Sequence, residues 1–366
     1  MKVGRAWPLK RPPSQKMTAT AFFSVFALLL VWLTNHIAAV KLPDAEHPLE
    51  IYSNTTRDDL RRLFVTAIGG AKQSVLLIIY TLTDQEVMGA LKQKAADGVS
   101  VTVICDSKTS TQVKRKLGSQ VKTIRRTSLG LMHQKILVID EKQTWLGSAN
   151  MTTESLRIHG NLVLGVQHPA LAENVWAKAR SMQLKPSARA AAALAPEGAE
   201  LAGYAPFSSY LADGQKIDLS FLPDDKAALE RLVSLMDQAK KTMRIAMFTW
   251  THPKLTQAVI NAHRRGVNVE AYVDFHSGRG VSAEVVHNLA KAGVKVSLSQ
   301  GSGLLHFKTL YIDDAILVNG SANWTRAAFT QNDDCFFVVH ALTEAQQNKM
   351  RRLFDILALE STPVSK

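Results

Sequence analysis

Residues 133–150, with the sequence HQKILVIDEKQTWLGSAN, are the most informative part of this chain because they have a counterpart at residues 306–323, HFKTLYIDDAILVNGSAN. Both segments contain a histidine, a lysine two residues later, an aspartate after four further residues, and a Gly-Ser-Ala-Asn tetrapeptide after six more. A single His-x-Lys pair occurs by chance in many chains. Two copies with identical spacing indicate an internal duplication.

The similarity between the two copies extends well beyond this motif. Residues 71–106 align with residues 239–274 at a constant offset of 168. The offset becomes 173 where Gly130 aligns with Gly303. We place the five-residue difference in a loop region around residues 275–303, because surface loops tolerate insertions. The chain therefore contains two copies of one structural unit.

Both copies contain the same order of predicted elements: an amphipathic helix, a buried strand, a second helix that ends at a glycine, and a β-branched strand. A strand, a helix and a strand in succession form a βαβ unit, so the fold class is α/β with helices on the faces of a sheet. We expect the first half at residues 51–185, an Ala-rich linker at 186–215 and the second half at 216–360. The predicted elements are 58–68, 74–80, 85–96 and 99–104 in the first half, and 225–236, 243–248, 255–264 and 267–273 in the second.

The N-terminal segment has the pattern of a membrane-targeting sequence. Residues 1–16 contain five cations and no acid, and an apolar stretch follows from Thr18 to Val40. A basic flank before an apolar run is typical of a secretory signal or an N-terminal anchor. We expect residues 1–40 to form an apolar helix that is either cleaved or retained, and the rest of the chain to be exported, as a periplasmic, extracytoplasmic or membrane-associated protein.

The composition is that of a globular protein with an anionic partner. A chain of 366 residues with 46% hydrophobic and 20% charged residues fits two domains of ordinary size. The net charge is +13, and subtracting the five N-terminal cations leaves +8 for the remainder. Only two cysteines are present, Cys105 and Cys335, which excludes a disulfide framework and a Cys-rich zinc site.

One part of this charge lies directly before the first motif. From residue 107 to residue 139 the chain has no acid. We interpret the cations of this segment as a platform for lipid headgroups or a nucleic-acid backbone, and a solvated cationic loop is the alternative. The cations are Lys108, Lys114, Arg115, Lys116, Lys122, Arg125 and Arg126.

Strand periodicity separates the polar residues of the motif. Residues two apart on a strand share a face, so His133 projects together with Lys135. The same spacing places His306 beside Lys308. Asp140 and Asp313 lie seven residues after their histidines and turn to the opposite face. We therefore expect these aspartates, although part of the catalytic motif, to support the site rather than to react.

The residue types in the motif suit chemistry at a phosphodiester. Lysine and asparagine donate hydrogen bonds to non-bridging phosphate oxygens, and a histidine pair divides the roles of nucleophile and general acid/base. No cluster of carboxylates suggests a metal, so we expect neither a metal nor another cofactor. The residues expected to contact the phosphate from the two Gly-Ser-Ala-Asn turns are Ser148, Asn150, Ser321 and Asn323.

With these residues the chain resembles the phospholipase D superfamily, whose signature is H-x-K-x4-D-x6-G-S-x-N. The resemblance covers nearly all of the chain beyond residue 50, and both copies of the motif are intact. It implies a duplicated α/β sandwich of two pseudo-symmetric halves with mixed sheets, with the active site between them. It also implies a covalent phosphohistidine. The family includes phospholipases, phosphatidyltransferases such as cardiolipin synthases, and metal-independent nucleases.

The two halves depart from each other at one position. Members of this family usually have an acid after the Gly-Ser-x-Asn turn, and this acid hydrogen-bonds a catalytic imidazole. Asp334, 28 residues after His306, fits this pattern, whereas Asn161 occupies the equivalent position after His133. The two histidines should therefore differ, because a carboxylate raises the basicity of an imidazole more than an amide does. By family analogy His133 is the nucleophile and His306 the acid/base.

These observations predict a phosphodiester hydrolase or transferase that acts on phospholipid at a membrane surface. The N-terminal segment favours lipid over other substrates. An exported metal-independent endonuclease with a nucleic-acid partner is one alternative, and a catalytically silent, membrane-anchored binding protein is another. We expect a monomer, because both half-sites lie in one chain. The headgroup and the acceptor, water or alcohol, stay open.

Overall fold

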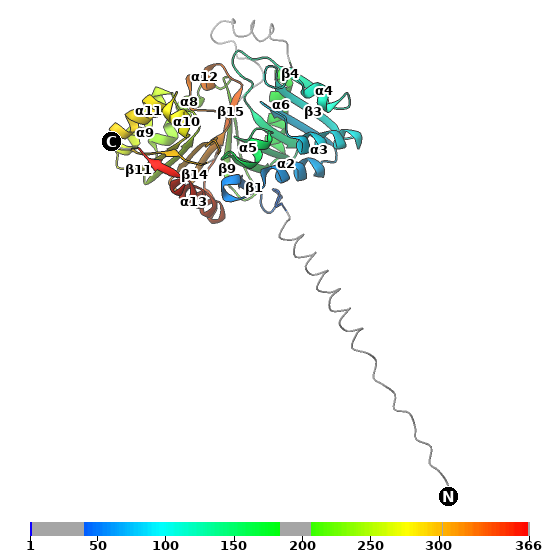
Figure 1. The fold of residues 1–366 in the computed structure, drawn as a ribbon, viewed down its shortest axis with the longest axis horizontal. Coiled ribbons are helices and arrows are strands. Elements are labelled where there is room, and N and C mark those ends of the chain that lie inside the picture. The colour runs from blue at the N-terminus through cyan, green and yellow to red at the C-terminus, as the bar shows by residue number, and fades with distance from the viewer. Residues whose placement is uncertain (2–39, 184–205, 302, 365–366) are drawn as a thin grey trace. The chain divides into compact units, whose positions relative to one another are not determined.

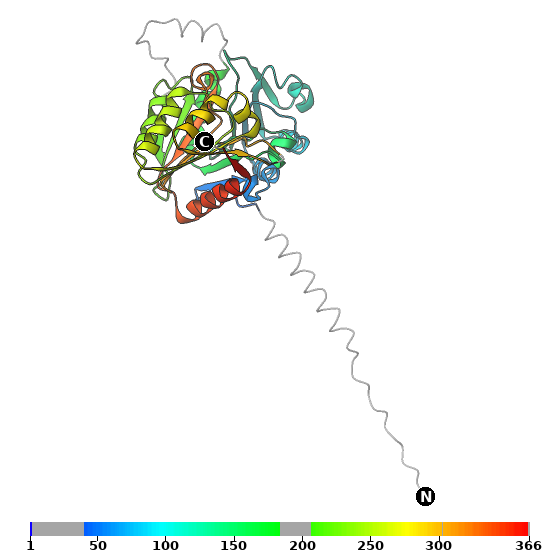
Figure 2. The same ribbon diagram turned by 60° about the vertical axis from the view of Figure 1, so that its left-hand side comes forward.

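The chain folds into two mixed β-sheets that belong to one compact unit from Leu42 onward (Figures 1 and 2). This computed structural model describes residues 1, 40–183, 206–301 and 303–364. The predicted apolar helix within residues 1–40 and most of the predicted linker fall outside these ranges. In the described part of the chain, no helix has the length and apolar character needed to cross a membrane.

The first half forms a seven-stranded sheet in the order β1-β7-β6-β5-β2-β3-β4. Strands β2, β3 and β4 run parallel, and the other neighbours pair antiparallel. The strands are β1 (Leu49–Ser53), β2 (Ser74–Ile79), β3 (Ser100–Asp106), β4 (Lys122–Arg126), β5 (Lys135–Ile139), β6 (Gln143–Gly147) and β7 (Leu162–Gln167). The helices are η1 (Asn54–Thr56), α2 (Leu60–Gly70), α3 (Gln85–Ala96), α4 (Val113–Leu117), α5 (Thr153–Arg157) and α6 (Pro169–Met182).

The second half repeats this topology in a nine-stranded sheet, β16-β12-β11-β10-β13-β14-β15-β9-β8. Its inner seven strands match the first sheet in order, which confirms the duplicated α/β fold with mixed sheets. The strands are β8 (Phe207–Tyr210), β9 (Lys216–Leu222), β10 (Thr242–Met247), β11 (Asn268–Val273), β12 (Lys295–Ser299), β13 (Lys308–Ile312), β14 (Ile316–Gly320), β15 (Asp334–Val339) and β16 (Ser361–Pro363). The helices are α8 (Ala228–Asp237), α9 (Pro253–Arg264), α10 (Phe275–Arg279), α11 (Ala283–Lys291), α12 (Arg326–Thr330) and α13 (Glu344–Leu359).

A hydrophobic core shared by both halves joins the two sheets. On β2, Leu76 and Ile78 belong to this core together with Leu317 and Phe337 of the second sheet. The intervening β2 residues turn to the opposite face, on the side of helices α2 and α3 (Figure 1). Strand β2 is therefore buried on both faces, which explains its continuous run of aliphatic residues.

Two predicted boundaries were wrong. Strand β8 lies within the predicted linker and extends the second sheet, so the second half begins near residue 207. Its sequence, FSSY, is short and alternates between half-buried and exposed residues, which resembles a loop. The segment 275–303, predicted as a loop region, contains α10, α11 and β12. At the corresponding place the first half has α4 and β4, so one short helix stands where the second half has α10 and α11.

Asp140 and Asp313 lie in the turns that follow β5 and β13, at the end of each strand remote from the histidine. Asp140 accepts hydrogen bonds from the backbone N–H groups of Lys72, Gln73 and Ser74, at 2.7–3.1 Å. Asp313 does the same for Lys240, Lys241 and Thr242. Both have a positive φ of 53°, a conformation that aspartate tolerates. Their carboxylates hold the start of the neighbouring strand, and among the described residues no hydrogen bond joins them to a histidine.

Replacing Asp140 by asparagine should lower the free energy of unfolding by about 1–2 kcal/mol, because charged acceptors bind N–H groups more strongly than neutral ones. Burial alone would raise the pKa of Asp140, but the three N–H groups outweigh it and lower the pKa. A carboxyl with a lowered folded-state pKa stabilises the fold above its unfolded pKa, about 3.9. The difference from wild type should therefore be constant from about pH 5 to 8 and shrink below about pH 4.

Urea denaturation across this pH range checks the prediction, and Asp313→Asn should behave alike. Glu141→Gln is the control, because Glu141 lies in the same turn and is exposed. Equal stability of Asp140→Asn and Glu141→Gln would contradict the role given to the carboxylate.

Candidate active site

The two histidines lie at the contact between the two halves, next to two β-bridges that join them. Met132 forms a β-bridge with Asp333, and Leu305 forms the equivalent bridge with Gly160. The backbone N–H of His133 then donates to the Asp333 carbonyl at 2.7 Å, and that of His306 donates to the Gly160 carbonyl at 2.9 Å. Each histidine is therefore anchored to the opposite half by its own backbone.

Two buried aspartates that the motif does not include support these segments. Asp106, at the end of β3, accepts from the Met132 N–H at 3.1 Å. Asp274, just after β11, accepts from the Leu305 N–H at 3.0 Å. Their equivalent positions in the two copies are visible in the sequence alignment. The alignment of Asp106 with Asp274 is the sequence signal for this role, but neither aspartate lies in the motif and neither was predicted as a site residue.

Each imidazole bonds to a side chain of the other half. Nδ1 of His133 lies 2.9 Å from Oδ1 of Asp334, and Nδ1 of His306 lies 3.0 Å from Oδ1 of Asn161. All four side chains are buried, and the two histidines keep 7% exposure each. The sequence left open which half Asp334 serves. The structure pairs it with His133, whereas the amide is the partner of His306.

The two motif serines face these partners instead of an open site. Ser321 Oγ donates to Asp334 Oδ1 at 2.6 Å, and Ser148 Oγ donates to Asn161 Oδ1 at 2.8 Å. Both serines are fully buried. Their expected contact with phosphate is therefore corrected: the hydroxyls are engaged in holding the carboxylate and the amide that orient the imidazoles.

The glycine before each serine is required by close packing. A Cβ on Gly147 would overlap the Leu162 carbonyl oxygen, and a Cβ on Gly320 would overlap that of Cys335. The Leu162 carbonyl is at the start of β7, one residue after Asn161, and the Cys335 carbonyl is in β15, one residue after Asp334. The missing side chain lets the two strands approach closely enough for the serine to reach its partner.

Asn150 and Asn323 end the two tetrapeptides in half-buried positions. The Oδ1 atom of each is buried without a hydrogen-bond partner in the described part of the chain. In the same part of the chain, no hydrogen bond is found for the side-chain Nδ2 atoms of these two residues. Their expected contact with phosphate stays a prediction, and these amides have donors to offer a ligand.

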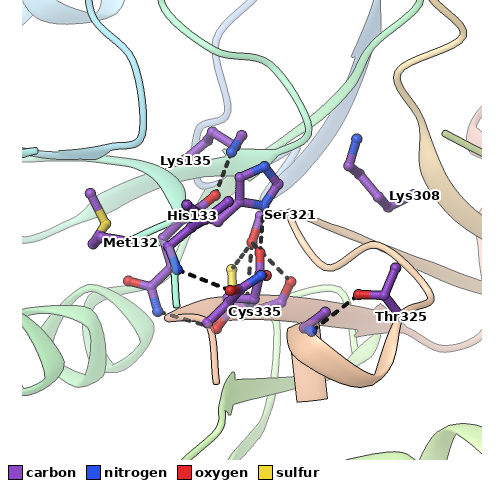
Figure 3. Close-up of polar contacts among 12 residues, drawn as sticks. Met132, His133, Lys135, Lys308, Ser321, Thr325 and Cys335 are labelled. Atoms are coloured by element: carbon purple, nitrogen blue, oxygen red, sulfur yellow. Dashed lines mark hydrogen bonds and ion pairs between the residues drawn. The ribbon is translucent and has the colours of Figure 1, made fainter. Parts of the chain in front are cut away.

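The two lysines also form a symmetric pair. Nζ of Lys308 donates to the His306 carbonyl at 2.7 Å, and Nζ of Lys135 donates to the His133 carbonyl. Each ammonium lies 4.9 Å from the centre of an aromatic ring, Tyr80 for Lys135 and Phe248 for Lys308. The same rings lie 5.0 Å from the imidazoles of His133 and His306. Figure 3 shows Lys135 and Lys308 around the His133 imidazole.

Tyr80 and Phe248 were not predicted as site residues. They follow the buried strands β2 and β10 at aligned positions, and an aromatic residue at a strand end resembles an ordinary core residue in the sequence. In the structure each ring packs against the histidine and the lysine of its half.

Burial lowers the pKa values of both lysines and both histidines, and repulsion by neighbouring cations adds to this for Lys308 and the two histidines. Burial is the main cause for Lys135, whose pKa falls to about 7, and for Lys308, whose pKa falls well below its ordinary value. Burial, followed by repulsion from Lys308, lowers the pKa of His306 well below its ordinary value. Burial and then Lys135 lower the pKa of His133, and Asp334 opposes this shift.

Asp334 is the carboxylate of this cluster. Burial would raise its pKa, but the neighbouring His133 and Lys135 and the Ser321 hydroxyl lower it on balance. Asp334 raises the pKa of both lysines, and Asp106 and Asp274 add to this for Lys135 and Lys308 respectively, yet burial keeps both pKa values lowered. An anion with several oxygens would raise these pKa values and restore protonation of the amines. In the described part of the chain, no group of His, Cys, Asp and Glu side chains has the arrangement of a metal site.

The sequence matches a family model described as the cardiolipin synthase, PLD-like domain, at residues 64–183 and 232–356, about two thirds of the chain. A protein named mitochondrial cardiolipin hydrolase from Xenopus tropicalis is 31% identical over 135 residues, which are 36% of this chain and 64% of that protein. A protein named phospholipase D from Rickettsia conorii is 26% identical over 124 residues, 34% of this chain and 61% of that protein. These alignments thus span less than two thirds of each relative.

Among solved structures, phosphatidylserine synthase from Haemophilus influenzae superimposes with a TM-score of 0.68. The superposition covers 88% of this chain and 89% of that chain, at 14% sequence identity. At this identity the similarity shows a common fold.

Ser321→Ala should reduce turnover of a soluble phosphodiester about tenfold or more, because it removes a hydrogen bond to a charged group worth about 1.5–3 kcal/mol. Ser148→Ala should reduce it less, about fivefold, because Asn161 is neutral. The loss should appear in kcat, since the hydroxyls orient imidazole partners. Steady-state kinetics check both variants, and a loss confined to KM would instead indicate direct contact with the phosphate.

Proposed function

This chain belongs to the phospholipase D superfamily, and on that basis we propose that it hydrolyses or transfers the phosphodiester of a phospholipid through a phosphohistidine. The observation that supports this proposal is the buried cluster of His133, Lys135, His306 and Lys308, in which Asp334 is the carboxylate bonded to an imidazole. A phosphodiester would add negative charge beside these buried groups and so favour protonation of the two lysines.

The two imidazoles divide the chemistry in the proposed mechanism. One Nε2 attacks phosphorus, a P–N bond forms, and the bond to the leaving oxygen breaks. The other imidazole gives its Nε2 proton to the leaving alkoxide and then removes a proton from water or an alcohol, whose oxygen displaces the first histidine from phosphorus. Lys135, Lys308 and the amides of Asn150 and Asn323 offer donors for the non-bridging oxygens. Because side chains supply this positive charge, we propose that no metal is needed.

The exposed cations of the segment that leads into the first motif support a membrane as the source of the substrate. They are Lys108, Lys114, Arg115, Lys116, Lys122 and Arg125, and no ion pair joins any of them to an acid in the described part of the chain. Arg126, the last cation of this run in the sequence, is instead buried and paired with Asp333 at 3.1 Å. Arg126 therefore does not belong to the exposed cationic surface.

Leu129 extends this surface toward the histidines. Its side chain is 91% exposed, in the loop that joins β4 to His133. An exposed leucine beside unpaired cations suits an anionic bilayer, in which the apolar side chain enters the interface and the cations bind headgroups. A nucleic-acid backbone would use the cations alone. The exposed leucine is the reason to prefer lipid over the endonuclease alternative.

The remaining parts of the proposal concern location and assembly. The N-terminal segment, outside the described residues, would export the enzyme and hold it near a membrane. Both half-sites lie in one chain, so the enzyme is proposed to work as a monomer with a phospholipid membrane as its partner. The acceptor, water or alcohol, decides between hydrolysis and transfer.

Incubation of the full chain with labelled phosphatidylglycerol or cardiolipin vesicles, and in parallel with plasmid and single-stranded DNA, tests the substrate class. We expect lipid turnover that persists in EDTA and is lost in His133→Ala and His306→Ala. The matched control is His340→Ala, a histidine paired with Asp218 away from the cluster. DNA cleavage without lipid turnover would favour the nuclease, and full activity in either active-site variant would refute the two-histidine mechanism.

The membrane surface predicts a second, separate effect. Replacing Lys114, Arg115 and Lys116 together by alanine should weaken binding to anionic vesicles about 100-fold, because each cation near such a surface contributes about 1 kcal/mol. Turnover of a soluble phosphodiester should be unchanged. Lys92, Lys291 and Arg352, which are also exposed, form a control triple with the same change in charge. Vesicle sedimentation measures both, and equal losses in the two triples would show that only net charge matters.

A further inference from the structure

A cavity of about 270 Å³ lies beside the β-bridge between Gly160 and Leu305. Leu305 and Phe307 line this cavity, and in the segment that leads into β13 their side chains point to the face opposite to that of His306. The cavity is therefore separate from the imidazole cluster. We propose that it is a second binding site, which takes a small zwitterion with an ammonium group and a phosphodiester.

The equivalent place beside the other β-bridge is occupied by a buried ion pair. At the sequence offset of 173, Arg126 at the end of β4 corresponds to Ser299 at the end of β12. Asp333 corresponds to Gly160, and each of these two residues forms one of the bridges between the halves. Nε of Arg126 lies 3.1 Å from Oδ2 of Asp333, and both side chains are buried. Ser299 and Gly160 line the cavity, so a hydroxyl and a missing side chain stand where the first contact has an ion pair.

Several polar groups around the cavity have no partner in the described part of the chain. Oγ of Ser361 is buried there without a hydrogen bond. The side chains of Arg157 and Glu360 line the same cavity, and neither forms an ion pair or a hydrogen bond with another described residue. A buried polar atom normally has a partner, and this volume is many times that needed by one water molecule. The cavity therefore has the room and the unmet hydrogen-bonding groups of a ligand site.

One wall of the cavity attracts a cation. Leu357 comes from the last turn of α13, and Glu360 directly follows this helix. A helix C-terminus has a partial negative charge, and α13 has no basic residue in its last turn to offset it. At the corresponding end of α6, the Arg126 guanidinium provides the positive charge, since its Nη1 donates to the Met182 carbonyl at 3.0 Å. An ammonium group in the cavity would take the place that this guanidinium has at the end of α6.

Another part of the lining suits an anion. Arg157 is the last residue of α5, and a guanidinium can donate two parallel N–H bonds to a phosphate. The hydroxyls of Thr55 and Ser361 line the same cavity and add further donors. A phosphodiester has one negative charge and two non-bridging oxygens, which these donors can share.

The two charged residues of the lining define the charge of the ligand. Arg157 and Glu360 have opposite charges, so a ligand with separated charges and no net charge complements both. A simple anion would meet Glu360 and the helix end, and a simple cation would meet Arg157. An amino alcohol in phosphodiester linkage has the required pattern. It could be a free glycerophosphodiester or the headgroup of a phospholipid, because both share this chemistry.

Isothermal titration calorimetry with glycerophosphoethanolamine tests the site in the full chain with the His133→Ala change, which prevents turnover. We expect binding to this protein. Adding Arg157→Gln or Glu360→Gln should weaken binding about tenfold or more, because each removes a hydrogen bond to a charged group. The charge-matched controls Arg62→Gln and Glu141→Gln change exposed residues elsewhere and should leave the affinity unchanged.

A second titration distinguishes the two sources of this chemistry. Dihexanoyl phosphatidylethanolamine, below its micelle concentration, has the same headgroup with two short acyl chains. Tighter binding than that of glycerophosphoethanolamine would identify a lipid headgroup as the ligand, and equal or weaker binding would identify the free diester. Absence of binding of both probes at millimolar concentration would overturn the proposal. Binding that is unchanged in Arg157→Gln and Glu360→Gln would do so too, because it would place the ligand elsewhere.

Ser299→Arg tests the cavity itself, because it introduces a guanidinium where Arg126 has one at the other contact. Ser299→Ala is the matched control, since both changes remove the hydroxyl that accepts from the Phe275 N–H at 3.1 Å, and only arginine fills the space. Binding should fall more than about tenfold in Ser299→Arg and stay within about twofold in Ser299→Ala. Urea denaturation verifies that both variants are folded, and the two charge variants decide the matter if Ser299→Arg is not.

Two further results would overturn the proposal. One is equal binding by folded Ser299→Arg and Ser299→Ala. The other is binding of inorganic phosphate or ethanolamine alone as tight as that of the diester, which would exclude a zwitterion site. Neither result bears on the proposed function, because the cavity lies on the face opposite to the histidines.

Discussion

The exchange of hydrogen bonds between the halves is the interaction on which the site depends. His133 takes its partner from β15 of the second half, and His306 takes its partner from the start of β7 in the first half. Neither half alone can orient its own imidazole. The duplication is therefore a requirement of the site, because the β-bridges at Met132 and Leu305 join the two halves and bring each ring to a partner in the other half.

Close strand packing makes this exchange possible. Gly147 and Gly320 allow β6 and β14 to lie against the carbonyls of Leu162 and Cys335. The serine after each glycine then donates a hydrogen bond to Asn161 or Asp334, the side chain that bonds the histidine of the other half. Asp140 and Asp313 fix the far ends of the histidine strands to the backbone. The motif thus contains residues for two tasks. Histidine and lysine form the reactive cluster, while aspartate, glycine and serine hold the strands that present it.

Local pattern predicted much of this, and long-range pairing explains what it missed. Identical spacing identified the His and Lys pairs, and strand periodicity turned Asp140 away from them. The partner of His133 lies 201 residues distant and that of His306 lies 145 residues distant, so no local pattern relates them. A serine hydroxyl suits a phosphate as well as a carboxylate, and only packing decides between these. Tyr80 and Phe248 resembled core residues because they are aromatic and follow buried strands.

A symmetric frame with unequal partners suits a reaction that needs two imidazoles in different states. A carboxylate favours the protonated form of its imidazole more than an amide does, so the two rings differ in their tendency to hold a second proton. One carboxylate and one amide divide the protonation states before substrate arrives. The cost is a buried charge, which Ser321, Asn332 and His133 offset by hydrogen bonds to Asp334. The two half-sites can therefore keep the same strand order, while Asp334 and Asn161 give their imidazoles different partners.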